Sequence, residues 1–391
     1  MPWIARQLAK ELQAMMTYYP IVTVIGPRQS GKSTLVQTIY PDMPYVSLED
    51  PDTRRLAVKD PRDFLERLPQ GGILDEIQRC PELLSYLQGI VDRRKQNGLF
   101  ILTGSHQLAL HEAITQSLAG RTAIIKLLPL SMQELQPYHT NTLEEYLFQG
   151  MYPRLYENNT PPPVFYRDYL QTYLERDVRL IVNVKDLGIF QQFMHLCAGF
   201  VGQILNHDSL SNMLGVSSRT IRQWISVLEA SFIVFQLQPY YENFGKRIIK
   251  AHKLYFYDVG LASFLADIQN PQQLQRDPLR GNLFENFIIS EILKNHLNKG
   301  IVPSLYFYRD SNRNEVDLII KSGSQLMPVE IKSSKTYNHD FLKGLSYFKN
   351  LVQERCGQGY LIYTGEQEQS VEGFKLLNYT NIAEIMTGQL S

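Results

Sequence analysis

A loop bounded by two glycines and followed by a lysine and a hydroxyl residue stands near the start of the chain, in the segment Gly26-Pro-Arg-Gln-Ser-Gly31-Lys32-Ser33. It fills every fixed position of the pattern G-x-x-x-x-G-K-[ST], and an apolar run at 21–25 precedes it. In such a loop backbone N–H groups surround phosphates, the following helix adds partial positive charge, and the lysine meets the β and γ oxygens. A coincidental glycine loop does not account for the preceding strand. The segment predicts a P-loop for ATP, with Ser33 on Mg²⁺ and a phosphate site formed by Gly26, Pro27, Arg28, Gln29, Ser30, Gly31, Lys32, Ser33 and Thr34.

Polar residues also end the next two apolar runs of the chain. Asp75 and Glu76 follow the first run, where a P-loop ATPase needs one carboxylate on Mg²⁺ and another beside the attacking water. We expect Asp75 to bind the metal and Glu76 to position the water, although paired acids at a strand end are also common in solvated turns. Ser105, preferred over Thr103, is expected to sense the γ-phosphate, with an ordinary strand-terminal turn as the alternative.

Arg121 follows a glycine at the end of a helical stretch. A guanidinium at this place can act as an arginine finger, which stabilises the γ-phosphate of a neighbouring subunit. This interpretation predicts a ring-like homo-oligomer, because the residue has no obvious reason to reach its own nucleotide. A surface salt bridge is an equally simple explanation.

A second group of chemically active residues lies toward the C-terminus: Glu285 in a helical stretch, Asp317 in an apolar strand, and Glu330 with Lys332 two positions further on. Twelve residues separate Asp317 from Glu330, so a two-stranded hairpin can bring their carboxylates together, with Lys332 on the same face as Glu330. Phosphodiester hydrolysis needs carboxylates that hold Mg²⁺ and an ammonium beside the attacking water. Solvated hairpins also carry this pattern. Glu315 is expected to face solvent, because it alternates with an apolar residue.

The middle of the chain has the spacing of a helix-turn-helix. Residues 209–214 predict a short helix, Gly215 permits the turn, and Ser217 is a suitable N-cap for a second helix over 218–228. On the second helix Arg219, Arg222 and Gln223 are expected to face outward while Ile221, Ile225 and Leu228 pack inward, and residues 232–235 supply a strand for a wing. Between residues 209 and 253 six Lys or Arg stand against two Glu, a local charge of +4, with aromatic residues at 240, 241 and 244. We expect DNA contact here, the alternative being a unit that only packs against its neighbours.

Short β-branched runs alternate with helical stretches, which indicates an α/β fold. Strands are expected at 21–25, 72–74, 99–102, 305–308, 316–320, 328–331 and 360–363, and residues 131–182 are expected to be mostly helical. Lys plus Arg number 39 and Asp plus Glu number 39, so net charge does not demand a nucleic-acid partner. The three cysteines form no C-x-x-C pair, which excludes a cysteine zinc site. No apolar run approaches the roughly 18 residues of a membrane span, so we expect a cytoplasmic protein without membrane contact.

The chain resembles the prokaryotic AAA-type ATPases that carry a C-terminal domain of unknown function. The segments that carry this resemblance are 23–34, 74–78, 102–105, 118–121 and 173–178. The resemblance implies an AAA-type core over 1–130, a helical lid over 131–185, a winged-helix element over 186–253 and a restriction-endonuclease-like domain over 254–391. The C-terminal acids and lysine also resemble the D…E-x-K nuclease signature, with Asp317 and Glu330 as metal ligands. They are similar to archaeal Holliday junction resolvases, in which a helix glutamate such as Glu285 joins the metal shell.

Two classes of function follow from these patterns. In the first, the protein is an ATP-driven enzyme that binds branched or single-stranded DNA and cuts it. In the second, it is a nucleotide-controlled switch whose nuclease-like domain only binds, and a branch-migration motor that never cuts is a related possibility. The first class is favoured because Glu285, Asp317, Glu330 and Lys332 are all present, whereas a degenerate site is expected to lose at least one of them.

Overall fold

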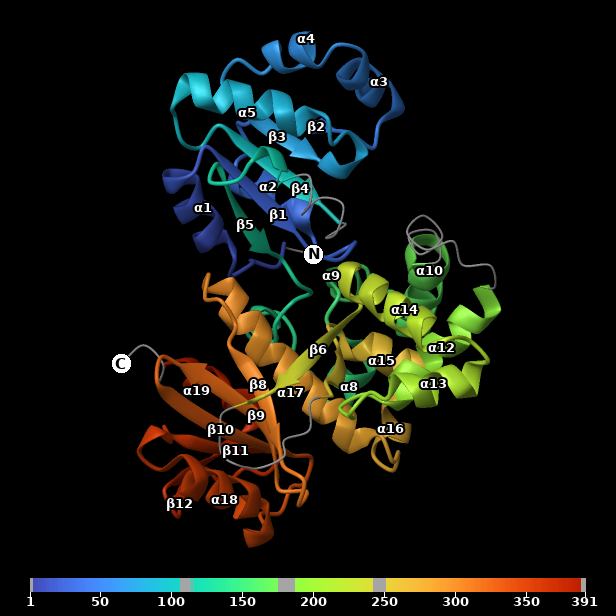
Figure 1. Ribbon diagram of the computed structural model, residues 1–391, viewed down its shortest axis with the longest axis vertical. Helices are drawn as coiled ribbons and strands as arrows, with labels where there is room; N and C mark the ends of the chain where they lie inside the picture. The colour runs from blue at the N-terminus through green and yellow to red at the C-terminus, as the bar shows by residue number, and fades with distance from the viewer. Residues whose placement is uncertain (1–2, 106–113, 115, 175–186, 242–250, 388–391) are drawn as a thin grey trace.

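The computed structural model describes residues 3–105, 114, 116–174, 187–241 and 251–387 (Figure 1). The N-terminal part is a five-stranded sheet in the order β2-β3-β4-β1-β5, and every neighbouring pair is parallel. Its strands are β1 (Ile21–Ile25), β2 (Tyr45–Ser47), β3 (Gly72–Asp75), β4 (Phe100–Gly104) and β5 (Thr122–Lys126). Its helices are α1 (Ala9–Tyr18), α2 (Lys32–Ile39), α3 (Pro51–Lys59), α4 (Pro61–Glu66) and α5 (Leu83–Arg94), with a 3-10 turn at Ile77–Arg79.

Helices cover both faces of this sheet, which is why its central strands are apolar on both sides. Val24 packs in one cluster with Leu12 of α1 and Leu35 of α2. Ile25, which points to the opposite face, packs in a second cluster with Leu87 of α5. The strands expected from the sequence in this region are all present, and the parallel register places the carboxyl ends of β1, β3 and β4 along one edge.

Helices dominate the chain between the two sheets. They are α7 (Met132–Leu135), α8 (Leu143–Gln149), α9 (Pro153–Glu157), α10 (Pro162–Tyr169), α12 (Leu187–Gly199), α13 (His207–Leu214), α14 (Ser218–Ala230), α15 (Val259–Leu265) and α16 (Pro271–Leu274), with a π-helical turn at Leu170–Leu174. The helix-turn-helix spacing is confirmed: Gly215 ends α13 with φ +66°, and the Ser217 side chain accepts the N–H of Thr220 at the start of α14. Part of the segment 173–178 that resembles the AAA-type family lies outside the described residues.

An eight-stranded mixed sheet forms the C-terminal part, in the order β12-β13-β11-β10-β9-β8-β6-β7. Its strands are β6 (Val234–Pro239), β7 (Lys253–Phe256), β8 (Leu305–Arg309), β9 (Glu315–Ser322), β10 (Gln325–Lys332), β11 (Gly359–Tyr363), β12 (Gln369–Val371) and β13 (Phe374–Asn378). The helices are α17 (Arg280–Asn298), α18 (Lys343–Val352) and α19 (Ala383–Thr387), with 3-10 turns at His339–Leu342, Gln353–Arg355 and Tyr379–Asn381. Strands β9 and β10 form the antiparallel hairpin expected from the sequence.

The strand expected as a wing at 232–235 is found as β6, two residues later, and it has a second role. Strand β6 pairs with β7 in an antiparallel ladder and with β8 in a parallel one, through Gln238 opposite Tyr306 and Pro239 opposite Phe307. The hairpin of the middle region is therefore continuous with the C-terminal sheet, and this ladder crosses the division expected between residues 253 and 254.

Helix α17 connects the parts of the molecule (Figure 1). It contacts β5 of the first sheet, β7 and β10 of the second, and α8 and α15 of the helical region. On its buried face Glu291 and Lys294 form an ion pair with a 2.7 Å separation and 1% side-chain exposure each. Glu291 accepts the backbone N–H of Met132, and Lys294 donates to the carbonyl of Leu130. The exit from the first sheet is thus fixed to α17 by buried polar contacts.

Candidate nucleotide site and C-terminal acidic cluster

The predicted P-loop lies between β1 and α2, at the carboxyl edge of the first sheet. A Cβ atom on Gly26 would lie 2.1 Å from the carbonyl oxygen of Leu127, and Gly31 has φ +89°, so both positions require glycine. Two side-chain atoms of the loop, Gln29 Oε1 and Ser30 Oγ, are buried without a hydrogen-bond partner among the described residues. A buried polar atom needs a partner. A bound phosphate can accept from the Ser30 hydroxyl, and a water molecule can donate to Gln29 Oε1.

Lys32 folds back over the loop that precedes it. Its Nζ atom donates to the carbonyl oxygens of Gly26 at 3.0 Å and Pro27 at 2.8 Å. Burial lowers the pKa of Lys32 to about 8, although the charges of Glu76 and Asp75 act in the opposite direction. The ammonium is held inside the loop by carbonyl oxygens, where an anionic phosphate is a much stronger partner.

Asp75, at the end of β3, accepts hydrogen bonds from three hydroxyl groups. Its Oδ1 atom accepts from Ser33 Oγ at 2.9 Å and from the hydroxyl of Thr103, and its Oδ2 atom accepts from Tyr45 OH at 2.7 Å. Burial and the neighbouring Asp75 raise the pKa of Tyr45. The adjacent oxygens of Ser33 and Asp75 are the hard donors that Mg²⁺ requires, so this pair fits the metal. No sequence pattern indicated Tyr45.

Glu76 begins a separate hydrogen-bonded group. Its backbone has φ +56°, and its N–H donates to Thr103 Oγ1 at 3.1 Å. Its carboxylate accepts from Ser105 Oγ at 3.1 Å and from the side-chain amide of Gln78, which also donates to Ser105. Thr103 therefore contacts the expected metal ligand, and Ser105 contacts the expected water-positioning acid.

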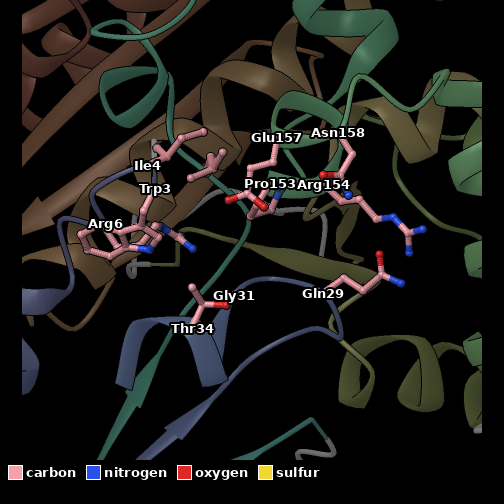
Figure 2. Close-up of a pocket in the computed structure, with 11 residues that line it drawn as sticks. Trp3, Ile4, Arg6, Gln29, Gly31, Thr34, Pro153, Arg154, Glu157 and Asn158 are labelled. Atoms are coloured by element: carbon pink, nitrogen blue, oxygen red, sulfur yellow. The ribbon is translucent and has the colours of Figure 1, made fainter. Parts of the chain in front are cut away.

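A cavity of about 390 Å³ borders the P-loop (Figure 2). It is lined by the N-terminal segment, the loop and α9: Trp3, Ile4, Arg6, Gln29, Gly31, Thr34, Leu130, Pro153, Arg154, Glu157 and Asn158. Arg6 fixes one wall, because its guanidinium donates to the carbonyls of Ser30 and Leu128, each at 2.6 Å, and to Glu134 at 3.2 Å. Sequence reasoning missed Arg6, whose partners lie far along the chain, although the capping box of Ser131 with Glu134 was readable as S-x-x-E.

Arg121 lies at the opposite edge of the sheet from the P-loop. Ile21 pairs with Thr122 at the start of β5, and the P-loop follows the last residue of β1. Five residues of strand correspond to about 17 Å. Arg121 forms a two-pronged ion pair with Asp92 of α5, at 2.7 and 2.9 Å. Arg121 is therefore remote from the nucleotide site of its own chain, and it forms an ion pair with Asp92 on the protein surface.

The residues expected to contact DNA occupy one face of α14. Arg219, Arg222 and Gln223 are exposed, whereas Ile221, Ile225 and Leu228 are buried as the pattern predicted. Basic residues 246, 247 and 250 and the aromatic residue 244 lie outside the described residues. The prediction that Lys253 belongs to the basic surface is wrong, because its side chain is 3% exposed and faces the C-terminal acids. Lys253 thus adds nothing to a surface for DNA.

The fold brings together the C-terminal residues that the sequence singled out. Asp317 of β9 and Glu330 of β10 both contact Lys332, whose Nζ atom lies 3.4 Å from Asp317 Oδ2 and 2.5 Å from Glu330 Oε1. Asp317 Oδ2 also accepts the backbone N–H of Ile331 at 2.8 Å. Glu285 reaches the same region from α17, and its charge acts on Glu330.

Sequence reasoning missed three further members of this acidic cluster. Lys253 at the start of β7 lies 3.1 Å from Glu285 and 2.7 Å from Glu315, and Tyr255 donates to Glu285 at 2.6 Å. The expectation that Glu315 simply faces solvent was wrong, because its side chain is 27% exposed and pairs with Lys253 and Arg309. The signal was its i, i+2 relation to Asp317, which places both side chains on one face of a strand.

Burial makes the charges of this cluster interdependent. It raises the pKa of Glu330 to about 8, to which the charge of Asp317 adds and which Lys332 opposes. Burial also raises the pKa of Glu285. Burial alone would lower the pKa of Lys332, but Asp317 and Glu330 outweigh it and raise that pKa. The ammonium groups are therefore held charged by the acids around them.

The fit of a divalent ion to this cluster is partial. Glu330 Oε2 is buried and lacks a hydrogen-bond partner among the described residues, and Asp317 lies beside it, which suits one hard cation. Over the described part of the chain no three acidic, histidine or cysteine side chains form a ready metal site. The side chain of Lys332 stands between Asp317 and Glu330, so a metal bound there would have to displace it.

Comparison with known proteins finds family models for three successive parts of the chain. An AAA domain model matches residues 18–136, and two domains of unknown function match residues 140–272 (DUF8612) and 280–382 (DUF4143). Uncharacterized proteins of Mycobacterium bovis and Mycobacterium tuberculosis are each 30% identical over 336 residues, covering 85% of this chain and 74% of theirs. A Walker-type ATPase of Pyrococcus abyssi has a TM-score of 0.37 at 15% identity, covering 66% of this chain and 94% of its own.

The parallel sheet, the P-loop and the matched domain model define the N-terminal part as an AAA-type ATPase domain, a nucleotide-binding module. The chain belongs to the family of the two mycobacterial proteins. In this chain the ATPase domain is followed by two regions that match domains of unknown function. Among the described residues, no helix is long and apolar enough to cross a membrane.

Proposed function

We propose that the protein is an ATP-hydrolysing DNA-processing enzyme, in which the AAA-type domain is coupled to metal-dependent cleavage of branched or single-stranded DNA by the C-terminal domain. One observation carries the proposal: Asp317, Glu330 and Lys332 meet on one hairpin with Glu285 nearby, and the buried Glu330 Oε2 has no partner among the described residues. Each side chain is of the type that phosphodiester hydrolysis uses.

In the nucleotide site, each residue has a separable role. Lys32 leaves its carbonyl partners to hold the β and γ phosphates, and Ser33 with Asp75 would hold Mg²⁺, which neutralises charge on the phosphates. Glu76 orients the attacking water, and Ser105, which donates to the Glu76 carboxylate, links that water to the γ-phosphate. A neighbouring subunit of a ring supplies Arg121 once it is released from Asp92.

In the DNA-processing half, the exposed face of α14 holds the substrate. Arg219 and Arg222 contact phosphates and Gln223 adds a hydrogen bond. Asp317 and Glu330 would hold Mg²⁺, which polarises the scissile phosphate. Lys332 then orients the attacking water or stabilises the charge that develops on the phosphate oxygens.

A second candidate is a nucleotide-controlled switch or branch-migration motor with a C-terminal domain that only binds DNA. It is favoured by the lysines that separate the carboxylates and by the lack of a ready metal site among the described residues. In this case the acidic cluster stabilises the fold and Lys332 never leaves its partners.

Two assays on the same purified protein distinguish these functions. Phosphate release from ATP is measured with single-stranded, duplex and four-way junction DNA, and cleavage of each DNA is measured with Mg²⁺ or Mn²⁺. Glu76→Gln is expected to bind ATP without hydrolysing it, whereas Lys32→Ala is expected to lose binding. A wild-type hydrolysis rate in Glu76→Gln would show that another group positions the water.

For cleavage, Asp317→Asn and Lys332→Met are expected to abolish cutting while ATP hydrolysis continues. Glu354→Gln, which changes an exposed acid of the same domain, is the matched control and is expected to cut normally. If the wild type leaves every DNA intact with either metal, with and without ATP, the nuclease is excluded and the switch or motor becomes the better description.

A further inference from the structure

Lys253 enters the acidic cluster from a distant part of the chain. It is the first residue of β7, whereas the acids come from α17, β9 and β10. Its side chain is 3% exposed, and its Nζ atom lies 5.5 Å from the centre of the Phe307 ring. A lysine is rarely buried to this extent unless it is paired, so its partners define what it does.

Two lysines divide the four carboxylates of the cluster into two pairs. Lys253 lies between Glu285 and Glu315, at 3.1 and 2.7 Å. Lys332 lies between Asp317 and Glu330, at 3.4 and 2.5 Å. The two pairs differ in their access to solvent, since the side chain of Lys332 is 33% exposed and that of Lys253 is 3% exposed.

The two pairs also differ in how completely their carboxylates are hydrogen-bonded. In the first pair, Glu285 also accepts from Tyr255 OH, and Glu315 also pairs with Arg309. In the second pair, Glu330 Oε2 has no partner among the described residues. The first pair is saturated by protein groups, and the second has a coordination position to fill.

We propose that Lys253 is a built-in cation that takes the place of a second metal ion, so that the cluster accepts one divalent ion, at Asp317 and Glu330. Lys253, together with Arg309 on Glu315, already supplies cations to Glu285 and Glu315, so a divalent ion is left to Asp317 and Glu330. Glu285 is then an ion-pair partner of Lys253 and does not bind the metal. The inference rests on the proposed metal site and adds its stoichiometry and the residue that sets it.

The reason is the cost of leaving buried carboxylates without a cation. Removal of one partner of a buried ion pair leaves an uncompensated charge, and such charges are paired or coordinate metals in folded proteins. Without Lys253, Glu285 keeps its hydrogen bond from Tyr255, and Glu315 keeps Arg309, whose side chain is 29% exposed. A second divalent ion is then the partner available to them.

Metal binding to the nucleotide-free full-length protein tests the proposal, and every chain compared carries Asp75→Asn, which removes the separate metal site at Ser33 and Asp75. Mn²⁺ is titrated and counted by electron paramagnetic resonance, and thermal unfolding is recorded in EDTA and in Mn²⁺. The Asp75→Asn parent is expected to bind one Mn²⁺ per chain and Lys253→Met two, with a larger gain in melting temperature from Mn²⁺ in the variant. Arg309→Met removes the other cation on Glu315 and is the control, expected to bind one ion.

The outcomes separate this inference from the proposed function. If the Asp75→Asn parent binds one ion, Asp317→Asn none, and Lys253→Met still one, Lys253 is only structural and the inference is wrong. If neither the parent nor Lys253→Met binds Mn²⁺, the proposed metal site itself fails. Two ions in the parent also overturn the inference, because the Lys253 position would then not exclude metal.

A second variant covers the case in which Lys253→Met does not fold. Lys253→Met combined with Glu285→Gln removes one charge of each sign, so it is expected to unfold in EDTA at a higher temperature than Lys253→Met. It is also expected to bind a single Mn²⁺, since Glu315 alone offers one carboxylate to a second ion. Two ions in this double variant would contradict the role assigned to Glu285.

Discussion

The buried pair of Glu291 and Lys294 offers a quantitative test of how α17 is joined to the ATPase domain. Glu291→Gln removes the negative charge at nearly constant volume and leaves the Lys294 ammonium, with 1% exposure, without its ion-pair partner and hydrogen-bonded to the Leu130 carbonyl. Loss of one partner of a buried pair costs about 3–5 kcal/mol. We expect a loss of this size in the free energy of unfolding, which is a large part of the stability of an ordinary domain.

The assay is urea unfolding followed by circular dichroism, with a double-mutant cycle. Lys294→Met added to Glu291→Gln removes the uncompensated ammonium, so the double variant is expected to be more stable than Glu291→Gln alone. Lys299→Met, at the exposed end of the same helix, is the control and should change stability by less than about 0.5 kcal/mol. Strict additivity of the two single losses would refute the reasoning, since coupled charges do not add.

Three further predictions concern the other sites. Burial raises the folded-state pKa of Glu330 to about 8, above its ordinary 4.5. Without metal, the wild type should therefore lose stability as the pH rises from 4.5 to about 8, and Glu330→Gln should lose less. Equal pH slopes of the melting temperature in the two proteins would contradict this. Reversing the charge of Arg219 and Arg222 should weaken DNA binding and flatten its salt dependence, and an unchanged dissociation constant would make α14 a packing element. Mixed Arg121→Ala and Lys32→Ala subunits should hydrolyse ATP only at interfaces that pair an intact Arg121 of one subunit with an intact P-loop of its neighbour. A strictly monomeric protein in light scattering with ATP would exclude an arginine finger from a neighbouring subunit.

Local patterns carried most of what the sequence could predict. The P-loop is contiguous, so its residue types and the flanking strand and helix were readable together. The second helix of the helix-turn-helix was readable for the same reason: Ser217 caps it, and its apolar residues recur at helical spacing. The hairpin of β9 and β10 needed only one short connection, so Asp317 and Glu330 could be paired from their spacing alone.

Contacts between distant segments could not be predicted in this way. Tyr45 reaches Asp75 because β2 pairs with β3, and nothing in a short β2 strand indicates that neighbour. Arg6 depends on carbonyl groups of the P-loop and of residue 128, which have no sequence signature. Lys253 looked like a surface cation because its neighbours are basic, and only the pairing of β7 with β6 turns it inward.

Strand β6 has a consequence for any attempt to take the molecule apart. Because β6 pairs with β7 on one side and with β8 on the other, a fragment starting at residue 254 would expose the edge of β8 and lose Lys253. Unpaired strand edges recruit other chains, so such a fragment is expected to aggregate even if its own core is intact. A C-terminal fragment that starts before Val234 keeps the whole sheet and the lysine. The same restriction applies to recombination between related proteins. A crossover before β6 takes all eight strands of the sheet from one parent.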